Sequence, residues 1–384
     1  MTEIALWVLV VVVAYAYTGY PLLLVLAAGV RSREVRFAPI EPPVTVVIAA
    51  FNEERDIARK LEMVLALDYP AAIRQVIVAS DCSTDRTHEI VQGFAARGVE
   101  LVALPERGGK TAAQNLAVSR ARGEIVVFTD ATTDLAPDVL RRLVEPFADP
   151  RVGCAGAHLE YRSAARTAIG RGGRLYWRYE RFIKRLESRA NSLIGVSGCL
   201  YAVRRALYVP IAPDLISDLV IALDVFESGH VTVYVPGAHV IEDTHERPDR
   251  EFAMRCRVVV RSIHALAQRA RLLDPFHAGV FALQLWSHKV LRYLVPELLI
   301  VIFALSAWLA WAPGPRAVFY QAFTALQFAV YAVVPTVYVI CRRFNIRTGA
   351  LSAPFYFVLA NAAALWGLVS YLRGVRAVTW TTVR

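Results

Sequence analysis

Long uncharged stretches stand at both ends of the chain, and a more polar block separates them. Residues 4–30 contain no charged side chain, and these 27 residues exceed the roughly 20 that a helix needs to cross a bilayer. Three further apolar stretches follow near the C-terminus, at residues 294–312, 317–341 and 348–372. The pattern therefore predicts a polar domain held between membrane helices.

The same pattern divides the chain into five parts. We expect an N-terminal transmembrane anchor at residues 1–32, a globular domain at residues 40–270, an interfacial amphipathic segment at residues 271–293, about three transmembrane helices at residues 294–372 and a tail at residues 373–384. A cleavable signal peptide is the alternative for the first stretch, but no basic residue precedes it and Pro21 lies inside it.

Basic residues indicate the orientation of the chain. Three arginines follow the first apolar stretch at residues 31–36, whereas Glu3 is the only charged side chain before it. Because basic residues gather on the cytoplasmic side, the globular domain is expected to face the cytoplasm of a bacterial-type inner or plasma membrane. Three complete C-terminal spans would leave Arg373 and Arg376 outside. Either the tail violates the rule, or one C-terminal stretch is re-entrant or interfacial.

Short β-branched runs alternate with helical patterns in the globular domain. Strands are predicted at residues 44–50, 76–80, 101–103 and 125–129, and helices at residues 51–67, 84–96 and 110–120. This alternation predicts an α/β fold with a doubly wound, mostly parallel sheet. A dehydrogenase-type Rossmann domain is the alternative, yet the first turn, Ala50-Phe51-Asn52-Glu53, lacks the GxGxxG of such domains.

Two of these strands end on an aspartate. Asp81 follows the second strand, and Asp130 follows the fourth. Ligands of open α/β sheets bind in the crevice beyond the carboxyl ends of the strands. Two acidic strand ends therefore indicate a polar ligand that binds with the help of a metal ion, and a sugar nucleotide would fit.

Composition and charge narrow the choice further. Hydrophobic residues make up 56% of the chain, which supports the prediction that part of the chain lies in a membrane. The net charge of +10 fits arginines at an anionic membrane surface and around a diphosphate better than nucleic acid, because no RNA-binding motif of interleaved aromatic and basic residues is present. The five cysteines, and His239 and His245, lack the spacing of a zinc site or a disulfide framework.

Two aromatic and basic stretches border the predicted membrane parts. Residues 176–193 interleave aromatic and basic side chains, as an amphipathic helix on an anionic membrane surface does. A helix packed on the sheet is the alternative. Residues 276–291 have a similar character just before the C-terminal spans. Both stretches would frame a pocket close to the lipid.

Six segments, in the expected order, resemble the membrane-bound family 2 glycosyltransferases. They are residues 49–54, 81–85, 108–115, 130–132, 195–205 and 217–261, and they span nearly the whole globular domain. The resemblance implies a GT-A fold and an inverting enzyme. Such an enzyme would move a sugar from a nucleotide diphosphate donor, expected to be a UDP-sugar, to a hydroxyl of a lipid-linked or growing glycan acceptor at the membrane.

The resemblance also implies a donor site. Asp81 resembles the carboxylate that pairs with the nucleotide base, and Glu53 and Asp85 resemble its neighbours around the base and ribose. The implied donor residues are Ala50, Glu53, Asp81, Asp85, Lys110, Asp130 and Arg257. Arg257 matches the arginine of the QxxRW motif of processive synthases, whose glutamine and tryptophan are missing here.

A divalent metal ion, Mg2+ or Mn2+, is part of the same resemblance. Asp130 resembles the first residue of the DxD motif, and the ion would neutralise the leaving diphosphate. The implied metal ligands are Asp130 and Thr132. A neutral hydroxyl therefore stands where the motif has its second carboxylate.

Asp218, in Ser217-Asp218-Leu219, resembles the catalytic base of the family. An inverting transfer needs one carboxylate to take the proton of the attacking hydroxyl. The alternative is that Asp218 only caps a helix. The residues implied on the acceptor side are Gly198, Tyr201 and Asp218.

Two other functions stay open on the sequence. A processive polysaccharide synthase would differ by the length of its product, and the missing glutamine and tryptophan of QxxRW argue against it. A non-catalytic membrane subunit that keeps a nucleotide-binding fold is the other alternative, because Thr132 weakens the metal motif.

Overall fold

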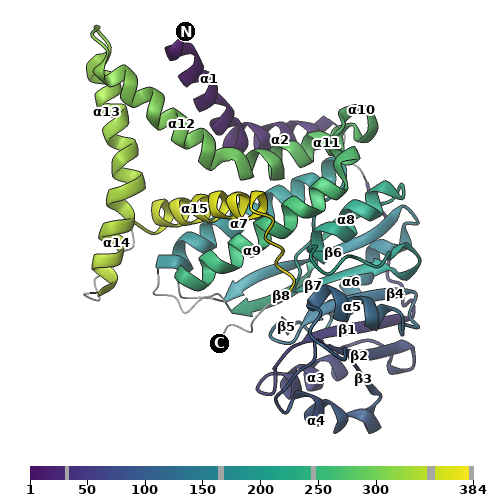
Figure 1. Cartoon of the computed structure of the whole chain (residues 1–384). Coiled ribbons are helices and arrows are strands. Elements are labelled where there is room, and N and C mark those ends of the chain that lie inside the picture. Colours follow the sequence, from purple (N-terminus) through teal and green to yellow (C-terminus); the bar gives the residue numbers. More distant parts are fainter. Residues whose placement is uncertain (31–33, 163–167, 244–247, 344–350, 380–384) are drawn as a thin grey trace.

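The computed structural model describes the chain except for residues 31–33, 163–167, 244–247, 344–350 and 380–384. It consists of an α/β domain and a group of long helices on one side of that domain (Figure 1). The helices follow the two ends of the sequence, as the apolar stretches predict.

Within the described residues, one sheet of eight strands forms the centre of the α/β domain, in the order β3-β2-β1-β4-β7-β6-β8-β5. Its first half is parallel and consists of β1 (Val44–Ala50), β2 (Arg74–Ser80), β3 (Val99–Ala103) and β4 (Ile125–Asp130). Each of these strands lies within two residues of a predicted strand. The predicted α/β class is confirmed.

The second half of the sheet changes direction. The strands are β5 (Asp134–Leu135), β6 (Val152–Arg162), β7 (Leu200–Arg204) and β8 (Val231–Asp243). β7 pairs antiparallel with both β4 and β6, and β8 then runs parallel to β6. β5 closes the edge against β8. The sheet is therefore mixed, and its parallel part carries both of the aspartate-tipped strands.

Alternate side chains of β1 serve two separate cores, because neighbouring residues of a strand point to opposite faces. Val46 and Ile48 pack with Leu61 on one face, whereas Val47 packs with Phe128 on the other. The first face is covered by α3 (Ile57–Leu65), α4 (Thr87–Gln92) and α6 (Val139–Val144), and the second by α5 (Lys110–Val118), α8 (Ser217–Glu227) and α11 (Val280–Leu285).

The helix predicted at residues 51–67 begins later than expected. α3 starts at Ile57, since the residues before it form a loop in which Asn52 has a φ of 54°. Asn52 Oδ1 accepts a hydrogen bond from the backbone N–H of Thr84 at 2.8 Å. The loop beyond β1 is thereby tied to the loop beyond β2, and both lie at the same edge of the sheet.

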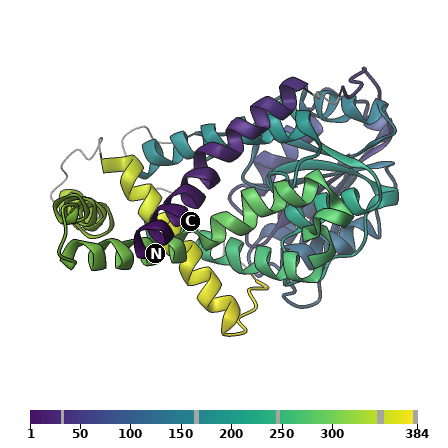
Figure 2. The ribbon, with the colours of Figure 1, turned by 90° about the horizontal axis from the view of Figure 1, so that it is seen from above.

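Among the described residues, four helical runs are long and apolar enough to cross a membrane: Thr2–Val30, Val280–Trp311, Ala317–Cys341 and Ser352–Leu372. Their helices are α1 (Thr2–Ala14), α2 (Tyr20–Val30), α12 (Leu291–Trp311), α13 (Ala317–Phe328), α14 (Val334–Arg343) and α15 (Ser352–Leu372). Seen from above, α13 and α14 lie at the end of the molecule away from the sheet (Figure 2). The segment predicted at residues 271–293 is divided, because α10 (Pro275–Ala278) stands apart and α11 continues into α12.

α7 (Ala168–Ala190) and α9 (Pro248–Gln268) lie between the sheet and the apolar helices (Figure 1). Ile183 of α7 packs against Tyr20 of α2. The ring of Tyr176 lies 5.6 Å from that of Tyr356 in α15. α7 therefore packs against other helices on two sides, and its expected position at a membrane surface stays a prediction.

The segment after α15 turns back onto the α/β domain. Arg376 makes an ion pair with Asp214 at 3.3 Å, and Val378 lies against Gly109. At the opposite end of the helix group, Glu3 pairs with Arg316, which precedes α13. The start of α1 and the connection between α12 and α13 thus lie side by side, far from the sheet (Figure 1).

Candidate active site

The start of α8 faces the loop that precedes β7. Asp218 lies in the first turn of α8, and its backbone carbonyl accepts a hydrogen bond from Val196 N–H at 3.1 Å. A Cβ built on Gly198 would lie 2.9 Å from Asp218 Oδ2, so glycine leaves room for the carboxylate. The helix begins after Ile216 without a side-chain cap, and among the described residues the Asp218 carboxylate makes no hydrogen bond or ion pair. The capping alternative is therefore wrong.

Lys110 links Asp130, at the end of β4, to the loop that contains Gly198. It is the first residue of α5, and its Nζ donates to Asp130 Oδ1 at 2.5 Å and to the carbonyl of Gly198 at 3.3 Å. Burial opposes the charge of Lys110, but the Asp130 carboxylate more than compensates and raises the pKa of Lys110 above its usual value. The structure thus brings together three residues that the sequence associates with the donor and acceptor.

Asp81 is fully buried beneath the turn that opens α5. Its Oδ1 accepts hydrogen bonds from the backbone N–H groups of Gly108 and Gly109 at 2.7 and 2.8 Å. Among the described residues its Oδ2 has no hydrogen-bond partner, and Arg107 Nε lies 3.6 Å away. A buried oxygen without a donor is costly, so this atom fits an N–H of a nucleotide base. The Arg107 guanidinium stacks 3.7 Å above the ring of Phe51.

Three other predicted donor residues shape the loops around Asp81. Asp85 Oδ1 accepts the backbone N–H of Thr87 at 3.0 Å. Glu53 is buried, and its backbone N–H donates to Thr87 Oγ1 at 2.8 Å. The carbonyl of Ala50 accepts the Asp81 N–H at 3.0 Å. These contacts give all three residues a structural role in the loop edge where the base would lie.

A cavity of about 470 Å³ extends from Asp130 and Asp218 toward the apolar helices. Its wall on that side comes from α7 and the apolar helical runs and includes Tyr17, Trp177, Lys289, Arg292, Tyr356 and Asn361. Asp81, Glu53 and Lys110 do not line it. The cavity therefore extends from Asp130 away from Asp81, toward the apolar helices.

The arginines of α9 differ in their availability. Arg255 makes an ion pair with Glu251 at 2.8 Å, and Arg261 donates to Thr111 Oγ1 at 2.9 Å. Arg257 lines the cavity, and among the described residues it makes no hydrogen bond or ion pair. Burial lowers the pKa of Arg257 from its usual value. Of the three, Arg257 is thus free to bind a diphosphate.

Tyr201 lies below the acceptor loop and does not face the cavity. It is fully buried, and its ring stacks on Phe128 with 4.9 Å between the centroids. Its hydroxyl donates to Ser217 Oγ at 3.4 Å. Tyr201, expected on the acceptor side, instead turns its side chain into the core, because side chains alternate along β7, so a direct contact with a ligand in the cavity is not supported.

Glu242 is a carboxylate that the sequence motifs missed. It lies near the end of β8 and lines the cavity with Asp130. Burial raises the pKa of Glu242 to about 7, and the charge of Asp130 acts in the same direction. The available signal was a third acidic strand end, at Glu242-Asp243.

The donor set fits a divalent ion that also uses oxygens of the substrate. Among the described residues, no group of three His, Cys, Asp or Glu side chains could hold an ion alone. Mg2+ in phosphate sites takes one or two carboxylates together with substrate oxygens, and Asp130, with Glu242 in the same cavity, meets that need. Thr132 is exposed and does not line the cavity, so its predicted role as a ligand is not supported.

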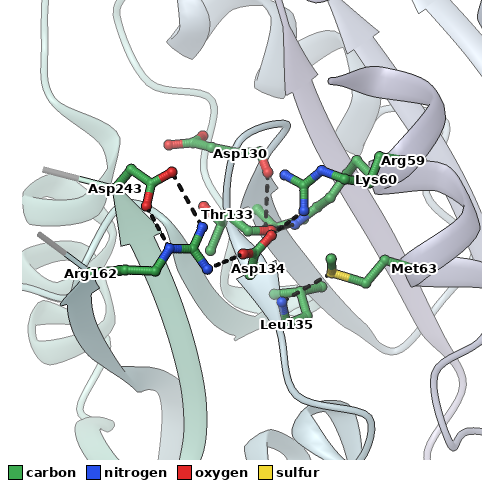
Figure 3. A network of polar contacts seen from close by, with 10 residues as sticks. Arg59, Lys60, Met63, Asp130, Thr133, Asp134, Leu135, Arg162 and Asp243 are labelled. Carbon is green, nitrogen blue, oxygen red and sulfur yellow. Dashed lines mark hydrogen bonds and ion pairs between the residues drawn. The ribbon is translucent and has the colours of Figure 1, made fainter. Parts of the chain in front are cut away.

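Lys60 supports the loop after Asp130 from below (Figure 3). It is fully buried, and its Nζ donates to Thr129 Oγ1 at 2.9 Å and to the carbonyl of Thr133 at 2.6 Å. Burial lowers the pKa of Lys60 to about 7, although Asp130 and Asp134 favour its charge. Sequence reasoning missed this residue, which reads as one more polar position on α3.

Ion pairs hold the same loop from the side (Figure 3). Asp134 pairs with Arg59 of α3 and, at 3.1 Å, with Arg162 of β6. Arg162 Nε also donates to Asp243 at 2.8 Å. The loop between β4 and β5 is thus tied to both halves of the sheet.

This fold and site define a glycosyltransferase with a GT-A fold. Residues 45–209 match the sequence profile of Glycosyl transferase family 2. The chain belongs to this family, so the predicted family, fold and enzyme class are confirmed.

Two similar proteins come from Rhizobium species. The succinoglycan biosynthesis protein ExoO of Rhizobium meliloti (strain 1021) is 35% identical over 118 residues, which are 31% of this chain and 32% of that protein. An N-acetylglucosaminyltransferase of Rhizobium leguminosarum bv. trifolii is 32% identical over 123 residues, or 31% and 67%. The match thus spans about a third of the first relative.

One solved structure resembles nearly the whole chain. The mannosyltransferase PcManGT from Pyrobaculum calidifontis, in complex with GDP-Man and Mn2+, superposes with a TM-score of 0.74 at 25% identity. The superposition covers 97% of this chain and 99% of that chain. The arrangement of apolar helices around the sheet is therefore shared as well.

The contact between Gly198 and Asp218 can be tested directly. A Gly198→Ala change places its Cβ 2.9 Å from Asp218 Oδ2 and must displace the carboxylate. We expect kcat to fall about tenfold to hundredfold, with little change in the thermal unfolding temperature. Gly195→Ala is the matched control, because its Cβ would meet ordinary contacts at 3.6 Å. Equal activity of the two variants would contradict the role given to this contact.

The buried charge of Lys60 predicts a pH dependence of stability. The unfolded chain keeps the Lys60 proton up to about pH 10.4, whereas the folded chain releases it near pH 7. The unfolded state therefore holds more protons in this window, and the free energy of unfolding should rise with pH by up to about 1.4 kcal/mol per unit. Thermal unfolding from pH 7 to 9 should show this slope in the wild type and a weaker slope in Lys60→Met. Arg59→Gln, a change at the half-exposed neighbour, should keep the wild-type slope.

Proposed function

We propose that the protein is an inverting glycosyltransferase that transfers one sugar from a nucleotide diphosphate donor to a hydroxyl of a lipid-linked or growing glycan acceptor at the membrane. The observation that carries the proposal is the position of Asp218. Its carboxylate has no partner among the described residues and lies where Asp130 and Gly198 meet a cavity that reaches the apolar helices.

Each residue of this junction has a task in an inverting transfer. Asp218 takes the proton of the acceptor hydroxyl as that hydroxyl attacks the anomeric carbon. Lys110 and Arg257 stabilise the negative charge of the departing diphosphate. A divalent ion held by Asp130 would supply further positive charge to the same leaving group. Gly198 has no side chain that would occupy the space beside the Asp218 carboxylate, so the sugar can approach this carboxylate.

Two observations point to different nucleotide bases in the donor. The sequence resemblance favours a UDP-sugar, whereas the archaeal neighbour was solved with GDP-Man. Asp81 Oδ2 fits an N–H of either base. A screen with UDP-, GDP- and dTDP-sugars in the presence of Mn2+ identifies the donor.

Asp218→Asn should separate chemistry from binding. The amide cannot accept the proton, so we expect transfer to fall about a thousandfold or more, while the Kd of the nucleotide with Mn2+ changes less than about threefold. Asp130→Ala should lose both activities. Product length on a gel also distinguishes a single transfer from polymer formation. Turnover of Asp218→Asn within about tenfold of the wild type would exclude Asp218 as the base.

We also propose that three of the four apolar runs cross the membrane and that α15 lies at the cytoplasmic interface. Support comes from the ion pair between Arg376 and Asp214, which holds the segment after α15 on the α/β domain. The pair between Glu3 and Arg316 joins the two ends that would lie outside. With this arrangement the arginines after α14 and after α15 are all cytoplasmic, as the positive-inside rule requires.

Fusion reporters test the topology. Green fluorescent protein fused after Arg384 should fluoresce in bacterial cells, and alkaline phosphatase at the same point should be inactive, because the C-terminus is cytoplasmic. A phosphatase fusion truncated after Gly314 should be active, since that connection lies outside. Active phosphatase at Arg384 would show instead that α15 crosses the membrane.

A further inference from the structure

The chain uses lysine sparingly. It contains four lysines against 39 arginines, and all four lie in the described part of the chain at positions that are buried or half-buried. Lys60 and Lys110 support the donor side, through the loop after Asp130 and through Asp130 itself. Lys184 and Lys289 have no part in the donor site. Because arginine is the usual cation elsewhere in the chain, the lysines at positions 184 and 289 indicate a specific role for an ammonium group there.

Lys184 and Lys289 line the acceptor cavity from two different helical segments. Lys184 belongs to α7, and its Nζ donates to Ser197 Oγ at 3.0 Å, next to Gly198. Lys289 belongs to the π-helical turn between α11 and α12. Both residues line the same cavity as Asp218. Within the described residues, neither ammonium group makes an ion pair with a carboxylate.

Glu180, the carboxylate of α7 that shares the cavity with the two lysines, already has partners. Glu180 accepts hydrogen bonds from Arg292 at 2.5 Å and from His288 Nε2 at 3.1 Å. Burial lowers the pKa of Lys184; Glu180 opposes this shift, and the charge of Lys289 adds to it. The Asp218 carboxylate in the same cavity offsets only one of these two mutually repelling ammonium groups, so a further anion is favoured beside them.

We propose that Lys184 and Lys289 form a binding site for a phosphate group on the acceptor side of Asp218, separate from the donor diphosphate. Compact ammonium groups form strong, charge-assisted hydrogen bonds to phosphate oxygens. The site lies on the wall of the cavity formed by helices α7 and α12, where Trp177 and Tyr293 offer apolar surface. The ligand class is therefore an amphiphile with a phosphate at its head. The assignment rests on the proposed function only in treating this cavity as the acceptor side.

Farnesyl phosphate and farnesol test the site, because they differ by the phosphate alone. The purified full-length protein in detergent should bind farnesyl phosphate at least about tenfold more tightly than farnesol, as measured by microscale thermophoresis. A double variant, Lys184→Gln with Lys289→Gln, should lose this preference. The double variant with arginine at both positions should keep most of it. Arg178→Gln, on the exposed side of α7, is the matched control and should bind like the wild type.

Equal binding of the two probes by the wild type would overturn the proposal, and so would a preference that survives in the double glutamine variant. Inorganic phosphate identifies the source of the anion. Strong competition by inorganic phosphate supports the site and assigns it to free phosphate, whereas weak competition supports the site and assigns it to a lipid head group.

Nucleotide binding separates this proposal from the proposed function. The double glutamine variant should bind UDP or GDP with Mn2+ as the wild type does. Failure of the wild type to bind either nucleotide would refute the transferase proposal. The phosphate site would still be tested independently by the comparison of farnesyl phosphate with farnesol.

Discussion

The antiparallel pairing of β7 with β4 is the constraint on which the site depends. Thr129 at the end of β4 pairs with Leu200 at the start of β7, so the loop before β7 arrives beside Asp130. A parallel strand at this position would place that loop at the opposite edge of the sheet. The change of direction therefore brings Gly198 and Asp218 to the donor strand, and the Lys110 ammonium then joins Asp130 to the carbonyl of Gly198.

Buried polar groups fix the α/β domain to the apolar helices. His288 lies between two carboxylates of α7, with Nδ1 at 2.7 Å from Glu187 and Nε2 at 3.1 Å from Glu180. Tyr20 of α2 donates to Glu187, and Arg292 of α12 donates to Glu180. Such a network is stable only when each member finds its partner, so it sets one position of α7 relative to α2 and α12. The position of these helices in turn fixes the cavity wall on the side of the apolar helices.

The parallel strands and the donor aspartates could be predicted because each depends on local pattern. β-branched runs give the strands, and the sheet then places Asp81 and Asp130 at one edge. Lys60 and Glu242 could not be predicted this way, because their roles depend on residues that are distant in the sequence. Lys60 donates to the carbonyl of Thr133, and Glu242 lies near the charge of Asp130. The inward direction of Tyr201 and the start of α3 at Ile57 depend on pairing and loop contacts for the same reason.

The two sides of the proposed site are built by different means. The donor edge is held by backbone groups: the N–H groups of Gly108 and Gly109 bind Asp81, and the Asp81 N–H binds Ala50. The cavity wall opposite this edge is assembled from separate helices that meet through side chains, since Glu251 and Arg255 of α9 both contact Tyr356 of α15. The family profile covers residues 45–209, which contain the loops around Asp81 and Asp130 and also α7, and it ends before α8 and α9. The cavity wall thus joins α7, which lies inside the profile, to α9, which lies beyond it, through side-chain contacts such as the Arg255 guanidinium 4.7 Å above the ring of Tyr176. A side chain of this wall can therefore change without altering the pairing of the strands.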